Sequence, residues 1–89
     1  MIHVMLKSCE TGQRSEFLPE KRSFRIHGYS TTVRLERAFW TVLEDLAIRN
    51  QMPLATLITL VHDRCTLSAH NNFTSFLRVL SLKYINIYN

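Results

Sequence analysis

The chain has 89 residues, of which 46% are hydrophobic and 20% are charged, and its formal net charge is +4. This length and composition suit one small folded domain and are not typical of a disordered protein. No apolar run approaches the roughly 18 residues of a membrane span, and the opening segment MIHVMLKSCE is too short and too charged for a secretory signal. We therefore expect a soluble, cytoplasmic protein.

Positive charge gathers ahead of the first long helical pattern, in residues 14–37, whereas the carboxyl-terminal half is nearly neutral. This asymmetry weakly favours a polyanionic partner, although a basic surface that serves only solubility explains it equally well. The charged residues concerned are Arg14, Lys21, Arg22, Arg25, Arg34 and Arg37, offset by Glu16, Glu20 and Glu36.

Residues 1–20 mix Gly, Ser, Pro and charged residues without a period, so we expect a flexible amino-terminal arm, with the segment IHVML near its start as a candidate strand. The folded domain is expected to span residues 21–89. Residues 21–29 alternate weakly, and Gly28 interrupts them, which predicts an extended arm or a strand with a bulge or bend.

Residues 30–35 predict a short β-strand, because they are rich in β-branched residues and alternate in polarity. Val33 and Leu35 then face one side, whereas Ser30, Thr32 and Arg34 face the other.

Three helices follow. The first is expected over residues 36–50, and its core stripe consists of Phe39, Leu43, Leu46 and Ala47, with Trp40 on the flank. If Trp40 is buried, its indole N–H needs a hydrogen-bond partner.

The second helix is expected to begin at Pro53, a residue that suits the first turn, and to end near Arg64 or Cys65. The third is expected from Phe73, with Asn72 or Asn71 as its cap. Val79 and Leu82 lie off the apolar stripe of this last helix, which suggests a second contact surface. That stripe consists of Phe73, Phe76, Leu77, Leu80 and Tyr84.

The strand at residues 30–35 runs into a helix with no loop, and we find no confident second strand for it. Since the backbone groups of a strand need partners, we favour a second copy of the same strand, paired about a two-fold axis as an antiparallel ribbon. The alternative is that IHVML folds back within the chain.

This order of elements, in the string GYSTTVRLERAFWTVLEDLAIRNQMPLATLI, resembles the ribbon-helix-helix DNA-binding proteins, which include the Arc and methionine repressors. The branch it resembles carries a further helix like NNFTSFLRVLSLKYI, and the likeness covers about residues 22–85. The resemblance implies a mainly α fold with one short β-strand, assembled as an intertwined ribbon-helix-helix homodimer with an extra carboxyl-terminal helix.

The resemblance also implies which residues contact DNA. Paired strands lie in the major groove, so Ser30, Thr32 and Arg34 would contact base edges. Alternatively, these side chains are ordinary surface, and Arg34 pairs with Glu36. Phosphates would be contacted by the backbone N–H groups of Leu54 and Ala55, although Pro53 stands where relatives usually carry a Ser or Thr cap, and by side chains of the arm, namely Lys21, Arg22 and Arg25.

The apolar residues of the strand and of the first two helices are expected to form the dimer core and not a ligand pocket. They are Val33, Leu35, Phe39, Trp40, Leu43, Leu46, Leu57, Ile58 and Val61.

No catalytic or cofactor motif occurs in the sequence, so we expect neither an enzyme nor a cofactor. His62, Cys65 and His70 give only three candidate ligands in no standard zinc spacing, and we expect no metal. Cys9 and Cys65 lie in very different contexts and do not suggest a disulfide framework.

The sequence therefore predicts a sequence-specific DNA-binding homodimer that regulates transcription as a repressor, with two dimers on adjacent half-sites. The alternative is a protein-interaction or antitoxin-like dimerisation module that uses the carboxyl-terminal helix and binds little DNA. Val79, Leu82 and the terminal YINIYN motivate this alternative.

Overall fold

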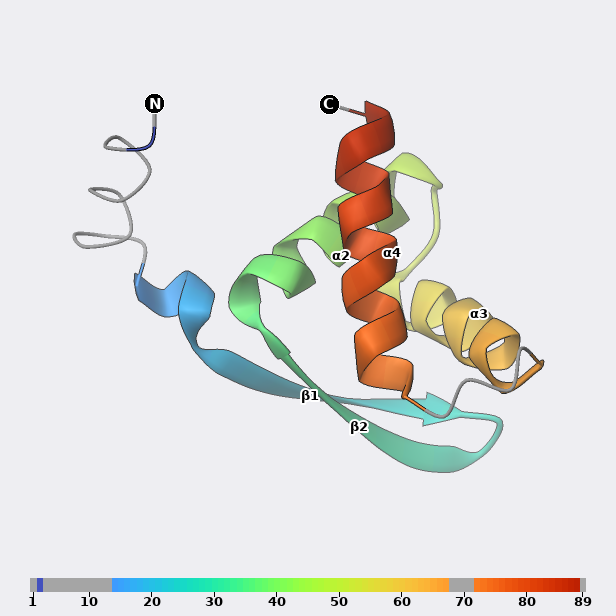
Figure 1. Cartoon of the computed structure of the whole chain (residues 1–89). Coiled ribbons are helices and arrows are strands. Elements are labelled where there is room, and N and C mark those ends of the chain that lie inside the picture. The colour runs from blue at the N-terminus through green and yellow to red at the C-terminus, as the bar shows by residue number, and fades with distance from the viewer. Residues whose placement is uncertain (1, 3–13, 68–71, 89) are drawn as a thin grey trace.

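The computed structural model describes residues 2, 14–67 and 72–88. In chain order its elements are the short 3-10 helix η1 (Arg14–Phe17), the strands β1 (Pro19–Ile26) and β2 (Tyr29–Glu36), and the helices α2 (Arg37–Arg49), α3 (Leu54–Leu67) and α4 (Phe73–Tyr88). Figure 1 shows the two strands as one long hairpin, with the helices gathered on one side of it. No helix in these ranges is both long and apolar enough to cross a membrane.

The two strands form an antiparallel sheet within one chain, with Pro19 opposite Glu36 at one end and Ile26 opposite Tyr29 at the other. The fold therefore has two strands and not one, and the expectation that β2 has no partner strand in its own chain is wrong. The pairing of β2 with a second copy of itself stays a prediction. The alternative partner IHVML lies, apart from Ile2, outside the described residues. The segment that we expected to be an extended arm or a bent strand forms β1, and the described structure is already folded from Arg14 onward.

The hairpin turn consists of His27 and Gly28, whose φ angles are 50° and 85°. Two consecutive positive φ angles define a type I′ turn, whose twist matches that of the flanking strands. We expected Gly28 to mark a bulge or bend within one strand, and this prediction is wrong. Gly28 is the second residue of a tight turn between two strands.

Replacing Gly28 by alanine is expected to destabilise the fold by about 1–2 kcal/mol, the cost of a left-handed conformation for an ordinary residue. A Cβ at this position would meet no atom within 4 Å, so the cost comes from the backbone alone. Gly28→Asn should cost less, because asparagine tolerates this conformation. Denaturant unfolding measures both, and equal losses for the two variants would contradict the left-handed turn.

The junctions around α2 explain why it needs no loop before it. The N–H group of Arg37, the first residue of the helix, donates to the carbonyl oxygen of Leu18 at 3.1 Å, so the chain entering β1 satisfies one of the free donors of the helix. At the other end, the side-chain amide of Asn50 donates to the Leu46 carbonyl at 2.8 Å, and Gln51 adopts a φ of 54° that turns the chain away. This junction confirms the expected stop at Asn50.

The expected starts of the other helices are also confirmed. The carbonyl of Pro53 accepts the N–H groups of Thr56 and Leu57, which opens α3. Asn72 caps α4, because its side-chain oxygen accepts the N–H of Ser75 at 3.0 Å.

The core lies between the inner face of the hairpin and the three helices. Leu35, Trp40, Leu43, Ile58 and Leu77 are completely buried in it. The indole N–H of Trp40 donates to the carbonyl of Glu20 at 2.8 Å, which supplies the partner that its burial requires. The residues that we expected at the dimer interface therefore belong to the core of a single chain: Val33, Leu35, Trp40, Leu43, Leu57, Ile58 and Val61 are buried, and Phe39 and Leu46 are partly buried.

Three carboxyl groups join elements that are far apart or stabilise a helix end. Glu36 pairs with Arg78, Asp45 accepts from Tyr84 and Arg49, and Asp63 contacts His27. The pKa of each carboxyl group is lowered, for Glu36 mainly by its own backbone N–H, for Asp45 by the Tyr84 hydroxyl and for Asp63 by the His27 ring.

A carboxyl group whose pKa is lower in the folded state stabilises the fold above its ordinary pKa, and this stabilisation is lost as the pH falls through the lowered value. The ordinary values are 4.5 for Glu36 and 3.8 for Asp45 and Asp63. We therefore expect the melting temperature to decrease as the pH is lowered below about 4.5. Asp45→Asn should make this decrease shallower, whereas Glu16→Gln, at an exposed carboxylate of η1, should not. Identical acid profiles for Asp45→Asn and the original chain would contradict the assignment.

Candidate nucleic-acid interface

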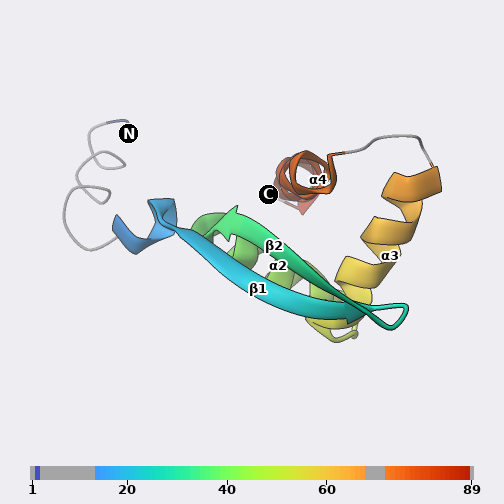
Figure 2. The ribbon, with the colours of Figure 1, turned by 90° about the horizontal axis from the view of Figure 1, so that it is seen from below.

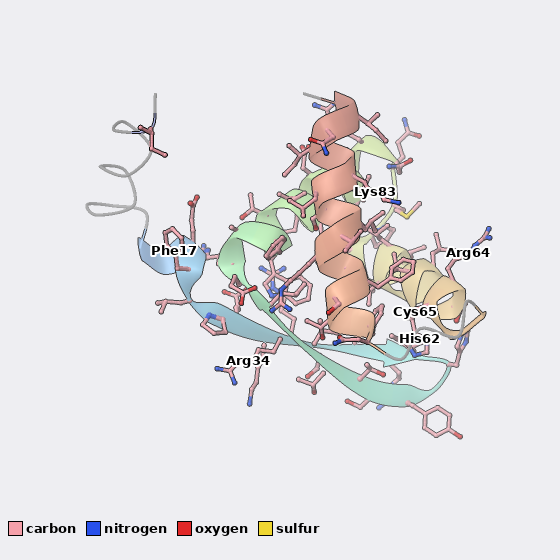
Figure 3. The ribbon with its side chains drawn as sticks, in the orientation of Figure 1. Phe17, Arg34, His62, Arg64, Cys65 and Lys83 are labelled. Carbon is pink, nitrogen blue, oxygen red and sulfur yellow. The ribbon has the colours of Figure 1, made fainter. Side chains whose placement is uncertain are left out.

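The face of the hairpin that points away from the helices carries six polar side chains, which we call the outer face. Because side chains alternate along a strand, one set of alternate residues of β1 and β2 lies on it. Glu36, the last residue of this set in β2, is not counted here, because its carboxylate bonds to Arg78 of α4. The pairing places Lys21 opposite Arg34, Ser23 opposite Thr32, and Arg25 opposite Ser30. All six residues are exposed. Figure 2 views the hairpin from this side, and Figure 3 shows Arg34 projecting below it, away from the helices.

The outer face is positively charged and lined with hydroxyl groups. Its six residues include Lys21, Arg25 and Arg34 but no carboxylate, and none of these three cations forms an ion pair with another residue that the structure describes. Between them, the hydroxyl groups of Ser23 and Thr32 lie 3.1 Å apart. An exposed two-stranded ribbon with free cations and hydroxyls has the chemistry needed to contact phosphates and base edges.

Arg34 forms neither a hydrogen bond nor an ion pair with Glu36, although its charge acts on that carboxylate. Glu36 instead accepts two hydrogen bonds from the guanidinium of Arg78, at 3.1 and 3.2 Å. The same guanidinium lies 5.9 Å from the centre of the Phe39 ring. Helix α4 therefore neutralises the acidic end of β2, and Arg34 keeps its charge available on the outer face.

Arg22 lies on the opposite side of β1 from Lys21 and Arg25. Its guanidinium is 2.8 Å from Glu20 and 2.7 Å from Glu44, and it lies 4.9 Å from the centre of the Trp40 ring. Of the three cations that we expected to contact phosphates from the arm, Arg22 is therefore held against α2, and only Lys21 and Arg25 reach the outer face.

Leu54 and Ala55, the expected phosphate-binding backbone groups, are the first two residues of α3. In the described part of the chain their N–H groups have no hydrogen-bond acceptor, as is usual in a first helical turn. Pro53, which has no hydroxyl group, therefore caps neither of these two donors.

The tip of the hairpin is fastened to α3. Nε2 of His27, in the turn, lies 2.7 Å from Oδ1 of Asp63, and α3 packs against β1. This contact links the hairpin turn to α3. Of the three candidate metal ligands, His70 lies outside the described residues, and no three His, Cys, Asp or Glu side chains gather into a metal site within the described ranges.

One outer-face residue, Ser23, was not expected. The sequence did contain a signal for it. Phe24 and Ile26 alternate with charged neighbours, and extending this alternation towards the amino terminus places Lys21, Ser23 and Arg25 on one face of the strand. Without the hairpin, however, there was no reason to place these residues beside Thr32 and Arg34.

The family model of the ribbon-helix-helix domain matches residues 19–85. Among solved structures, the chain is similar to an uncharacterized protein from Bordetella pertussis Tohama I, with 39% identity and a TM-score of 0.76. This match covers 90% of the present chain and 66% of the other one, so the chain spans slightly less than two thirds of that protein. No curated protein matches the sequence.

Proposed function

Given that the chain belongs to the ribbon-helix-helix family, whose members commonly bind DNA and are typically not enzymes, we propose that it is a sequence-specific DNA-binding repressor of transcription. It acts in the cytoplasm as a homodimer. The observation that carries this proposal is the outer face, on which three unpaired cations and three hydroxyls lie on an exposed ribbon without a carboxylate.

The β2 side of the outer face enters the major groove, which accommodates the two-stranded ribbon formed by β2 and its copy in the partner chain. Arg34 donates two hydrogen bonds to O6 and N7 of a guanine, the geometry that a guanidinium matches best. Thr32 contacts a base through its hydroxyl or its methyl group, and Ser30 does so through its hydroxyl.

The homodimer forms through the second edge of β2. In the described residues only β1 pairs with β2, so its other edge has no strand beside it. The edge of β1 is blocked by charge and by proline, with Pro19, Lys21, Arg22 and Arg25, whereas β2 carries no charge from Tyr29 to Val33. Uncharged, β-branched edges favour the addition of a strand, and charged or proline-bearing edges oppose it.

Two hairpins joined in this way place the β2 strands in the middle and the β1 strands outside. At about 4.8 Å per strand, the outer strands lie about 14 Å apart, which exceeds the major-groove width of about 12 Å, so only the two β2 strands enter the groove. The β2 side chains then reach base edges, whereas Lys21 and Arg25 of β1 lie near the phosphates on either side. The N–H groups of Leu54 and Ala55 contribute a further phosphate contact.

The proposal is tested by the salt dependence of DNA binding, measured by fluorescence anisotropy with a labelled duplex. Each phosphate contact contributes about −0.9 to the slope of log K against log salt. The variant Lys21→Gln/Arg25→Gln should therefore flatten the slope by about 2 units if one chain binds and by about 4 if a dimer binds. The control Arg64→Gln/Lys83→Gln removes the same charge from α3 and α4 and should leave the slope nearly unchanged. Equal effects of both variants would contradict the assigned interface.

The dimer itself is tested without DNA, by light scattering coupled to size exclusion. A particle of about twice the chain mass of 10.5 kDa is expected. A monomer that nevertheless binds DNA with the smaller slope change would show that one hairpin suffices and would overturn the pairing of the β2 edges.

A further inference from the structure

The outer face carries a pair of hydroxyl groups in its middle. Ser23 of β1 lies opposite Thr32 of β2, and Oγ of Ser23 is 3.1 Å from Oγ1 of Thr32, so the two side chains share a hydrogen bond across the strands. Both residues are exposed, and neither side chain has another hydrogen-bond partner in the part of the chain that the structure describes. Cross-strand hydroxyl pairs stabilise sheets, but this pair lies on the face that we assign to DNA.

The β1 member of the pair lies between two cations. Lys21 and Arg25 are two residues before and two residues after Ser23, so the alternation of the strand places all three on one face. In the function proposed above, Lys21 and Arg25 lie near phosphates, and Ser23 therefore faces the same phosphate backbone. Thr32, by contrast, belongs to the strand that enters the groove.

The number of hydrogens in this pair limits what Thr32 offers to a base. Each hydroxyl group has one hydrogen to donate. Phosphate oxygens only accept hydrogen bonds, so Ser23 donates its hydrogen when it contacts a phosphate. The bond between the two side chains then uses the hydrogen of Thr32, and Ser23 accepts it. Thr32 has no second hydrogen for a base, and its methyl group is the part that remains for recognition.

Turning Thr32 so that it donates to a base would have a cost. Threonine is branched at Cβ, so a rotation that moves its hydroxyl group also moves its methyl group. The rotation would break the bond to Ser23 and leave the serine oxygen without that hydrogen in a surface that DNA covers. A contact between the Thr32 methyl group and the methyl group of a thymine keeps the bond, and this contact is one of the established ways of reading a base.

From the shared hydrogen bond and the flanking cations, we propose that Ser23 is a positioning residue. It holds the hydroxyl group of Thr32, so that Thr32 recognises thymine through its methyl group. This inference rests on the DNA-binding function proposed above, and it adds the base that the middle of β2 prefers. Ser23 itself contacts no base.

The test replaces thymine by deoxyuridine, which lacks only the methyl group. The duplex is one that the original chain selects from a random library, its thymines are replaced one at a time, and affinity is measured by fluorescence anisotropy. We call the ratio of the two affinities the thymine preference. One position in each half-site should give a preference of about 3–5-fold, the value expected for burying one methyl group.

Variants of Thr32 identify the group that reads the base. Thr32→Ser keeps the hydroxyl group and removes the methyl group, so it should abolish the thymine preference. Thr32→Val keeps a methyl group and removes the hydroxyl group, so it should retain the preference. The control Thr41→Ser makes the same truncation at an exposed residue of α2 and should leave the preference unchanged.

Variants of Ser23 test the positioning role. Ser23→Ala should lower the thymine preference by about 2-fold, the effect expected for a cross-strand hydroxyl pair, because Thr32 is then free to rotate. Ser23→Thr restores a hydroxyl group and should recover the preference. In the Thr32→Val background Ser23→Ala should have no further effect, because valine has no hydroxyl group to hold.

Three outcomes would overturn this inference and leave DNA binding intact. They are a selected duplex that no deoxyuridine replacement weakens, a thymine preference that survives Thr32→Ser at every position, and an equal effect of Ser23→Ala with threonine or valine at position 32. Failure to bind any duplex would overturn the proposed function as well, so the two failures are distinguishable.

Discussion

Arg34→Ala is expected to weaken binding to a duplex selected by the original protein from a random library by about 10–100-fold. Loss of one bidentate arginine–guanine contact costs about 1–3 kcal/mol of discrimination. Binding to an unselected duplex should fall much less. Affinity for such a duplex depends mainly on phosphate contacts, and the contact of Arg34 with a base adds little to it. The measurement is a competition between the two duplexes at one fixed salt concentration.

The controls separate geometry from charge. Arg34→Lys keeps the charge but not the planar pair of donors, so it should lose most of the discrimination and little of the overall affinity. Arg64→Ala removes an exposed cation of α3 and should change neither. If Arg34→Ala binds the selected duplex as tightly as the original chain, Arg34 does not contact a base.

Leu77→Ala is expected to destabilise the chain by about 2–5 kcal/mol, the usual cost of truncating a fully buried leucine. Leu77 is 0% exposed, and it lies on α4 in contact with the core that the hairpin, α2 and α3 share. The expected loss is a large fraction of the stability of a small domain. Chemical denaturation followed by circular dichroism measures it.

The matched control is Leu82→Ala on the same helix. Leu82 is 55% exposed, so the same truncation should cost less than about 0.5 kcal/mol. A small effect of Leu77→Ala would mean that α4 does not belong to the core of its own chain. Comparable large effects at both positions would mean that a partner buries Leu82 in solution.

Much of the helical part of the fold was predictable because its signals are local. The apolar stripe of α2, the stop at Asn50, the start at Pro53 and the cap at Asn72 each depend on residues within one or two turns. The need of Trp40 for a hydrogen-bond partner was also predictable, although the partner, the carbonyl of Glu20, was not.

The hairpin was not predicted, because the residues that stabilise β1 are far from it in the sequence. Glu20 and Arg22 occupy the inner face of β1, where a strand that packs on a core normally carries apolar residues. They are tolerated because Arg22 pairs with Glu20 and Glu44 and covers the ring of Trp40. A pattern of alternation cannot reveal a partner on α2. The turn was missed as well, because His-Gly is not among the residue pairs that usually form a type I′ turn.

The outer face was half predicted. Its β2 side, with Ser30, Thr32 and Arg34, follows from the phase of the strand alone. Its β1 side required the hairpin pairing, which adds Ser23, keeps Lys21 and Arg25, and places Arg22 on the other face. The role of these residues on DNA is a proposal that their placement supports.

The most direct test of the central claim, that the outer face contacts DNA, is an NMR titration of the 15N-labelled chain with a duplex selected by binding. The account predicts that the largest amide shifts belong to outer-face residues, with smaller ones at Leu54 and Ala55 and almost none from Phe76 to Lys83. Shifts concentrated on the helices, with the hairpin amides unchanged at saturation, would contradict it.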